Sequence, residues 1–233
     1  MEDEVIKHTK KIFTTAKDKN KALIEKAIEI IAEVLIIVFA VTLSIWLHGW
    51  SEHRQQQKEV REFLSDLKED LNNDIRSMQS TNNSLQKNID NFRILEQLDK
   101  HGLDSIAKLN GSLHYSSSVG TTKISNGNYE GFKSSGKIGL IENKELKKHI
   151  LKYYQELAPD ILEAEKINAE QVLKLTDFWN DNAGRDYKVI FLDPRFKSRL
   201  ETILAVTAND SEQYQQAISL AKEIIDQIDK QDN

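Results

Sequence analysis

The stretch GFKSSGKI, Gly131–Ile138, contains residues whose types and spacing could bind a phosphate group. It matches the G-x-x-x-x-G-K core of a nucleotide-binding loop, in which backbone N–H groups and the lysine hold the phosphates. Ile138, however, occupies the position where that loop needs a Ser or Thr hydroxyl for magnesium, and no strand is predicted before it. We therefore interpret Gly136 as part of an ordinary helix-ending turn and expect no nucleotide there.

His48, Glu52 and His53 would lie close together on a helix, and both residue types can bind a metal ion. We interpret them as a solvated group beside a membrane and expect no metal and no cofactor. The chain has no cysteine, which excludes disulfides, thiolate catalysis and Cys-ligated metals. No Ser-His-Asp set and no paired carboxylates can be recognised from spacing, so we expect no catalytic residue and no enzyme. The remaining central histidines have no companions at ligand spacing: His101, His114 and His149.

His48 lies within the apolar stretch EIIAEVLIIVFAVTLSIWLHGW, Glu29–Trp50, and Glu52 and His53 follow it closely. Val34 to Trp50 carries no formal charge and would span roughly 25 Å as a helix, and the preceding turn completes a bilayer crossing. A helix that is apolar on every side is either buried in protein or surrounded by lipid. Because the mean hydropathy of the chain is −0.53, little other apolar material could cover it. We predict a transmembrane helix at 27–50, with Trp46 and Trp50 as interfacial anchors.

The ends of this helix predict its orientation. Seven lysines precede it, whereas four basic residues occur among the residues that follow it most closely. Basic residues favour the cytoplasmic side, so residues 1–26 form a short cytoplasmic tail and 51–233 an extracytoplasmic domain, periplasmic or extracellular. The long charged region before the span and the bulky residues after it predict an uncleaved signal anchor in the inner membrane. Glu33 extends to the cytoplasmic headgroups, is protonated, or pairs with a polar group of another helix inside the membrane.

A helical pattern begins after Trp50. Apolar residues recur with heptad spacing from Val60 to Phe92, with one extra four-residue step between Leu71 and Ile75, and no Pro or Gly interrupts 51–100. This pattern predicts one long helix continuous with the span. Its apolar stripe is either a coiled-coil seam between protomers or the inner face of an intramolecular bundle. We favour the bundle, because later helices can cover the stripe.

The rest of the chain predicts an all-α domain with one irregular part. Residues 101–142 are rich in Gly and Ser, with at most short helices around Leu103–Leu109 and Tyr129–Ser134. Residues 143–230 are mainly helical, with Asn143 as an N-cap and Gly184 as a stop. Tyr187–Leu192 has strand composition without a partner strand, so we expect an extended connector. Asp193–Pro194 fits a cap followed by Pro, with helices at 194–206 and 210–229.

Two stretches resemble a known family: Ala32–Glu33 with the run ending at His48–Glu52, and the segment Asn128–Tyr154. The family comprises uncharacterised single-pass membrane proteins, frequent in Bacteroidota and known only as a domain of unknown function. The shared features are Glu33, Trp50, Glu52, the Ser134–Ser135–Gly136 turn, and Leu140, Ile141, Asn143 and Leu146 at a helix start. Ala32 replaces a Gly of the family pattern, and His48–Gly49 replaces an Asn pair. The resemblance implies an N-terminal transmembrane helix and a helical outer domain, with no known activity.

These observations favour a membrane-anchored interaction or scaffold protein that binds another protein or a second copy of itself. In this interpretation Tyr115, Tyr129 and Phe132 are partly exposed anchors for the partner, because aromatic residues dominate binding hot spots. They could equally plug the end of the bundle. The alternative function is a small-ligand sensor that acts through a membrane partner, with residues 110–140 closing a pocket against the helices. A net charge of −5 and the absence of a strongly basic stretch give no reason to expect nucleic acid.

Overall fold

The computed structural model describes residues 6–7, 10–12, 23–108 and 120–231. Every regular element in this described part is helical, which confirms the all-α class. The chain divides into two compact units, 1–59 and 60–233, which are described separately. The long helix α2, Leu23–Gln97, begins in the first unit and ends in the second.

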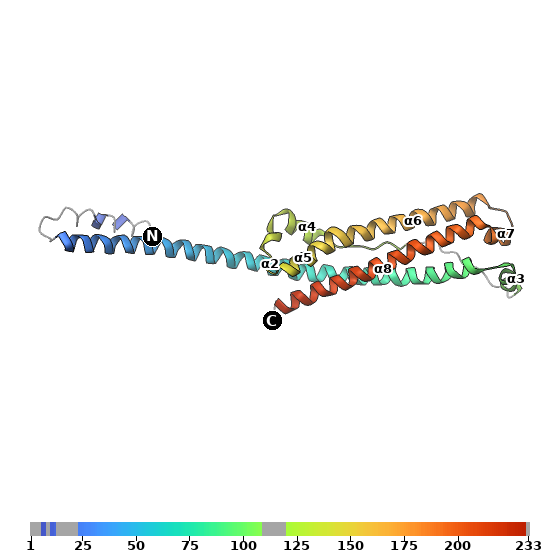
Figure 1. Ribbon diagram of the computed structural model, residues 1–233, viewed down its shortest axis with the longest axis horizontal. Helices are drawn as coiled ribbons and strands as arrows, with labels where there is room; N and C mark the ends of the chain where they lie inside the picture. The colour runs from blue at the N-terminus through green and yellow to red at the C-terminus, as the bar shows by residue number, and fades with distance from the viewer. Residues whose placement is uncertain (1–5, 8–9, 13–22, 109–119, 232–233) are drawn as a thin grey trace. The chain divides into compact units, whose positions relative to one another are not determined.

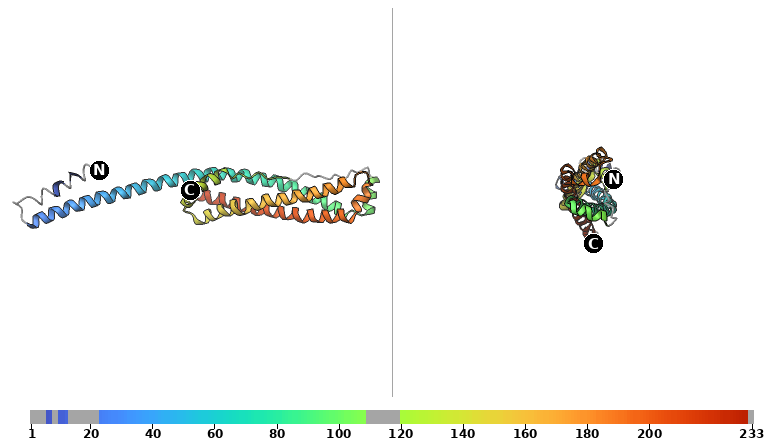
Figure 2. Two further views of the ribbon diagram at one scale, coloured as in Figure 1. Left: turned by 90° about the horizontal axis from the view of Figure 1, so that it is seen from above. Right: turned by 90° about the vertical axis from the view of Figure 1, so that its right-hand side faces the viewer.

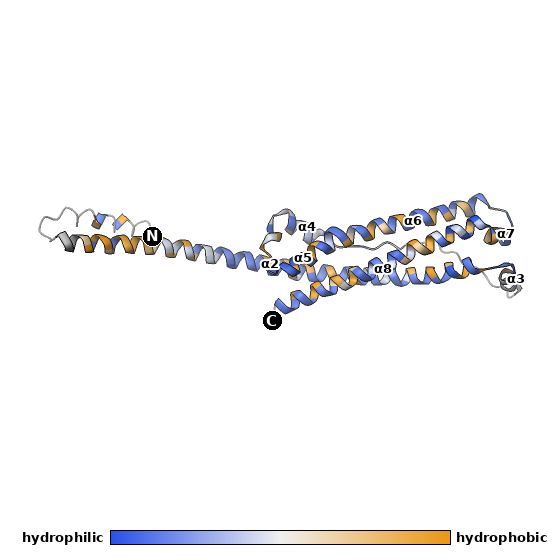
Figure 3. Cartoon of the chain, viewed as in Figure 1, coloured by the Kyte–Doolittle hydropathy of each residue, from blue (hydrophilic) through white to orange (hydrophobic). Residues whose placement is uncertain are grey.

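The first unit contains the apolar run, and its side chains are largely uncovered. Within 27–50, Glu33 is the one buried residue, while large apolar residues such as Phe39, Ile45 and Trp46 are exposed. Figure 3 shows this part of α2 as a predominantly apolar region. Among the described residues, α2 is the one helix that is both long and apolar enough to cross a membrane. The predicted helix at the apolar run, continuous with the helix that follows, is confirmed.

The second unit is built on three long helices: α2 from Val60 onward, α6 (Ala158–Asp181) and α8 (Pro194–Gln231). These helices lie side by side in Figures 1 and 2. Helix α8 is antiparallel to α2, because Lys68 contacts Asp229 near one end and Lys197 donates to the Leu95 carbonyl near the other. Helices α6 and α8 also pack against each other, and Asn168 of α6 donates a hydrogen bond to Thr207 of α8.

The apolar stripe of α2 faces the inside of this bundle. Its buried members are Val60, Leu64, Leu67, Leu71, Ile75, Met78, Leu85, Ile89 and Phe92. Because α6, α8 and shorter helices of the same chain cover them, the prediction of an intramolecular bundle is confirmed over a seam between protomers. Asn82, at one stripe position, is half-buried and accepts a hydrogen bond from Ser211 Oγ at 2.8 Å.

Shorter helices close the bundle. They are α3 (Lys100–Lys108), α4 (Gly127–Ser134), the 3-10 helix η1 (Lys137–Leu140) and α5 (Lys144–Lys152). The expected turn after α4 is confirmed, because Gly136 has a φ of 74°, which favours glycine. Asn143 caps α5 as predicted, accepting from the N–H groups of Glu145 and Leu146. A π-helical segment, η2 (Tyr153–Leu157), leads into α6. Its wider turn leaves room for Pro159, whose ring would crowd an ordinary helical turn.

Two predictions for the C-terminal part are wrong. Tyr187–Leu192 is the helix α7 instead of an extended connector. Asp186 caps it by accepting from Lys188 N, and Ile190 and Phe191 are buried, so tertiary packing overrides the strand composition. Residues 194–206 and 210–229 form one helix, α8, without a break. Its predicted start is confirmed, since Asp193 Oδ1 accepts from Arg195 N at 2.9 Å.

Candidate functional site

A polar layer interrupts the core of the second unit. One apolar cluster includes Leu67, Leu71 and Tyr153, and the other includes Phe92, Phe178 and Phe196. Between them, buried polar side chains from α6 and α8 face each other. They are Glu165, Asn168, Thr207, Asp210 and Ser211. Because a buried polar group is costly unless it is hydrogen-bonded, this layer is the part of the bundle that packing alone does not explain.

The first part of the layer joins α6, α8 and the segment before α4. Glu165 Oε1 accepts hydrogen bonds from Thr122 N at 2.8 Å and from the Tyr214 hydroxyl. Thr122 Oγ1 donates to the Tyr214 oxygen at 3.0 Å. Burial raises the pKa of Tyr214, and the Glu165 carboxylate raises it further by accepting the phenolic proton's hydrogen bond. Tyr214 therefore stays protonated as a donor, and this part of the layer is satisfied.

The second part of the layer is incompletely satisfied. Asn168 Nδ2 donates to Thr207 Oγ1 at 3.2 Å and to Asp210 Oδ2 at 2.5 Å. Asp210 is 3 % exposed, yet its Oδ1 has no hydrogen-bond partner among the described residues. The same holds for Oε1 of the nearby Gln213. Two buried acceptors one helical turn apart therefore remain open on the same side of α8.

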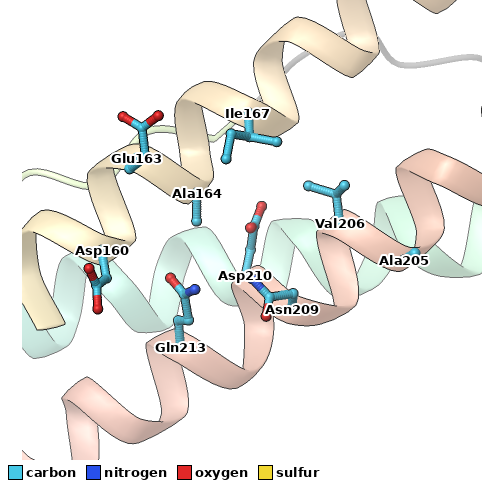
Figure 4. Close-up of a pocket in the computed structure, with 9 residues that line it drawn as sticks. All are labelled: Asp160, Glu163, Ala164, Ile167, Ala205, Val206, Asn209, Asp210 and Gln213. Atoms are coloured by element: carbon cyan, nitrogen blue, oxygen red, sulfur yellow. The ribbon is translucent and has the colours of Figure 1, made fainter.

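Asp210 and Gln213, the residues that carry these two acceptors, both line a cavity between α6 and α8. Its volume is about 440 Å³. Figure 4 shows the Asp210 carboxyl pointing from α8 toward α6, near Ala164 and Ile167. The complete lining comprises Asp160, Glu163, Ala164 and Ile167 from α6, and Ala205, Val206, Asn209, Asp210 and Gln213 from α8. The cavity thus combines apolar walls with carboxylate and amide oxygens.

The position of Asp210 changes its protonation. Burial raises its pKa to about 6, with the neighbouring Glu165 charge acting in the same direction and the Asn168 hydrogen bond opposing it. With a pKa of about 6, the carboxyl is mostly ionised at pH 7, and the carboxylate can accept a hydrogen bond from a cation that enters the cavity. Within the described ranges, no three His, Asp or Glu side chains gather closely enough to hold a metal ion. The cavity is therefore suited to a ligand that donates hydrogen bonds to carboxylate and amide oxygens.

Asp210→Asn is expected to remove a pH dependence of stability. The folded-state pKa of about 6 lies above the ordinary value of 3.8, so the folded state binds the proton more tightly. The resulting stabilisation is complete below the unfolded pKa and is lost as the pH rises through the folded pKa. This gap corresponds to about 3 kcal/mol. In denaturant titrations, wild type should lose about this much relative to Asp210→Asn between roughly pH 4 and pH 7.

The matched control for this measurement is Asp226→Asn, which makes the same change at an exposed position of α8. Its stability should follow wild type at every pH. Parallel pH profiles for wild type and Asp210→Asn would contradict the burial of an ionising carboxyl.

Glu33 has a partner within its own chain. It is 4 % exposed, and its carboxylate forms an ion pair with Lys11. This partner lies in the N-terminal segment of the same chain, and extension of Glu33 to the headgroups stays a prediction. An intramembrane contact of Glu33 with a second helix stays a prediction.

The predicted interfacial anchors, Trp46 and Trp50, are both exposed. The Arg54 guanidinium lies 4.8 Å from the centre of a Trp50 ring, a cation–π contact one helical turn away. His48, Glu52 and His53 are exposed on the same helix. An interfacial role for the two tryptophans stays a prediction.

The prediction that Tyr129 and Phe132 are partly exposed partner anchors is wrong. Tyr129 is 0 % and Phe132 9 % exposed. Tyr129 stacks on Tyr154 with ring centres 4.4 Å apart, and Phe132 stacks on Phe63 at 3.9 Å. Helix α4 therefore turns both rings into the bundle, as expected of the aromatic plug. Tyr115, the third predicted anchor, lies outside the described residues.

The sequence interpretation missed the polar layer and its cavity. This cavity lies between α6 and α8, and none of its lining residues comes from residues 110–140. A pocket against 110–140 stays a prediction, because residues 109–119 lie outside the described part of the chain. The missed signal is periodicity: Asn168 falls between Ile161 and Leu175 on the buried stripe of α6. A polar residue at an apolar stripe position marks a possible buried network.

Comparison with known proteins identifies no relative of this chain. No protein-family model, no curated protein and no solved structure matches the chain.

Proposed function

We propose that this chain is a membrane-anchored interaction protein without enzymatic activity. Residues 27–50 cross the inner membrane, 1–26 lie in the cytoplasm, and 51–233 form an extracytoplasmic domain that binds another protein or a second copy of the chain. The observation that carries the proposal is the exposed apolar run of α2, which nothing in the described chain covers except around Glu33. Lipid would remove this surface from water. No backbone group would be left unsatisfied, because the N–H and C=O groups of a helix form hydrogen bonds with one another.

The lysine excess before the run supports the orientation, since short basic segments are retained in the cytoplasm. The resemblance to uncharacterised single-pass proteins supports the same topology, and we propose membership of that family. Neither argument identifies the partner.

Helix α7 supports the interaction role. Tyr187, Val189 and Leu192 are 41 %, 48 % and 38 % exposed, although Ile190 and Phe191 of the same helix are buried. We propose that these three apolar side chains form a contact surface for the partner protein. This surface of α7, instead of the buried Tyr129 and Phe132, is the proposed contact site for a partner protein.

Single-cysteine variants test the proposal, because the chain has no cysteine of its own. In spheroplasts, a membrane-impermeant maleimide should modify Val189→Cys at once and Lys7→Cys only after permeabilisation. The reverse pattern would contradict the orientation. A benzophenone maleimide attached at Val189→Cys should then form a photo-adduct of higher mass, whereas one at the exposed α6 position Glu170→Cys should form little. Equal yields at the two positions would contradict a contact surface on α7.

The second candidate function is an extracytoplasmic small-ligand sensor. The cavity between α6 and α8 favours it, because two buried oxygens there, on Asp210 and Gln213, have no hydrogen bond among the described residues. Concave apolar sites with a few convergent polar groups are the usual form of ligand pockets. Such a sensor would need a membrane partner to relay the signal.

A further inference from the structure

We propose that the cavity between α6 and α8 binds a small organic ammonium ion, with Asp210 as its counter-ion and Gln213 as a second acceptor. This inference deepens the proposed sensor function and rests on it. The membrane anchor does not depend on this inference and is tested by a different experiment.

The charges around the cavity favour a cation. Asp160 and Glu163 stand at its α6 side and Asp210 at its α8 side, and none of the nine lining residues is Lys or Arg. Lys166, the adjacent basic residue on α6, lies 4.0 Å from Glu163 and outside the lining. A cavity bordered by carboxylates with low-dielectric walls concentrates positive ions.

The two open acceptors define where the ligand nitrogen would bind. Asp210 is almost fully buried, and one of its oxygens is already held by Asn168, so the other is fixed in direction. Gln213 Oε1 is the neighbouring buried acceptor. Leaving such atoms without a donor costs free energy, and an N–H group of an ammonium ion would recover it through a charge-assisted bond.

The remaining wall determines the rest of the ligand. Ala164, Ile167, Ala205 and Val206 present methyl and methylene groups to the cavity. A bare metal ion gains nothing from such a surface and needs several more oxygen ligands. An ammonium group attached to an apolar body fits both halves of the site, and a volume of about 440 Å³ leaves room for one aromatic ring.

Calorimetric titration of the full chain in lipid nanodiscs with benzylammonium chloride tests the proposal, with empty nanodiscs as the blank. We expect saturable binding to wild type and about tenfold or greater weakening in Asp210→Asn, which loses the counter-ion. Gln213→Leu should weaken binding to a smaller extent. Asp226→Asn, on an exposed part of α8, should bind as wild type does. Benzyl alcohol, which has the ring without the charge, should bind at least about tenfold more weakly than benzylammonium.

Three results would overturn the proposal: no saturable binding of benzylammonium to wild type, equal binding to folded Asp210→Asn, or equal affinity for benzyl alcohol. Circular dichroism of each variant, compared with wild type, establishes that it is folded. If Asp210→Asn does not fold, Gln213→Leu and the neutral ligand decide the outcome. Failure here would leave the labelling pattern of Val189→Cys and Lys7→Cys unchanged, so it is distinguishable from failure of the membrane anchor.

Discussion

Tyr129→Ala is expected to destabilise the second unit by about 3–5 kcal/mol, a large part of the stability of an ordinary domain. The Tyr129 ring is fully buried and stacks on Tyr154, and its hydroxyl accepts a hydrogen bond from Gln155 Nε2 at 2.7 Å. Truncation removes the stacking contact and leaves a cavity beneath α4. Denaturant unfolding of the full chain in mild detergent, followed by far-ultraviolet circular dichroism, measures the loss.

Tyr187→Ala is the matched control, since Tyr187 is a half-exposed tyrosine of α7 and should cost about 1 kcal/mol or less. The comparison separates a core residue from a partner anchor. Wild-type stability in Tyr129→Ala, together with loss of the photo-adduct at Val189→Cys, would contradict the buried plug and restore Tyr129 as a binding residue.

Helix existence and the main core face could be predicted from the sequence because both follow from local spacing. The stripe from Val60 to Phe92 repeats often enough to define a face, and a chain with later apolar helices can bury it internally. Asn143, Gly136 and Asp193–Pro194 are likewise local signals, since each acts on backbone groups within a few residues.

The elements that were predicted wrongly depend on distant contacts. Tyr187–Leu192 has strand-favouring residues, but Phe191 packs on Trp179 and Phe196, with ring centres 5.5 and 5.2 Å apart, and helical geometry permits both contacts. The expected break after residue 206 falls where α8 carries the polar residues Thr207 and Asp210. Those side chains bond across to Asn168, so α8 continues through them.

The prediction that Tyr129 and Phe132 are exposed was wrong for a related reason. A Gly- and Ser-rich segment is usually exposed, which made Tyr129 and Phe132 reasonable anchors. Here the segment before α4 is fixed along α2: Ser125 N donates to Asp74 Oδ1 at 2.8 Å and Lys123 N to Ser77 Oγ at 3.0 Å. Burial raises the pKa of Asp74, which also accepts from the Tyr153 hydroxyl. Sequence spacing contains no information about pairs this far apart.

Val38→Lys combined with Val41→Lys is expected to abolish stable membrane insertion. Both side chains are exposed in the middle of the apolar run. Each lysine near the centre of a bilayer costs about 2.5–3.5 kcal/mol on the insertion scale, so the pair costs about 5–7 kcal/mol. Ile94→Lys is the matched control, because it places the same charge on another exposed apolar position of α2, outside the run.

Alkaline carbonate extraction of membranes from cells that express the full chain tests the anchor most directly. Wild type and Ile94→Lys should remain in the membrane pellet, and the double lysine variant should appear in the supernatant. Release of wild type by carbonate, while a known single-pass protein stays in the same pellet, would contradict the membrane anchor on which the proposed function depends.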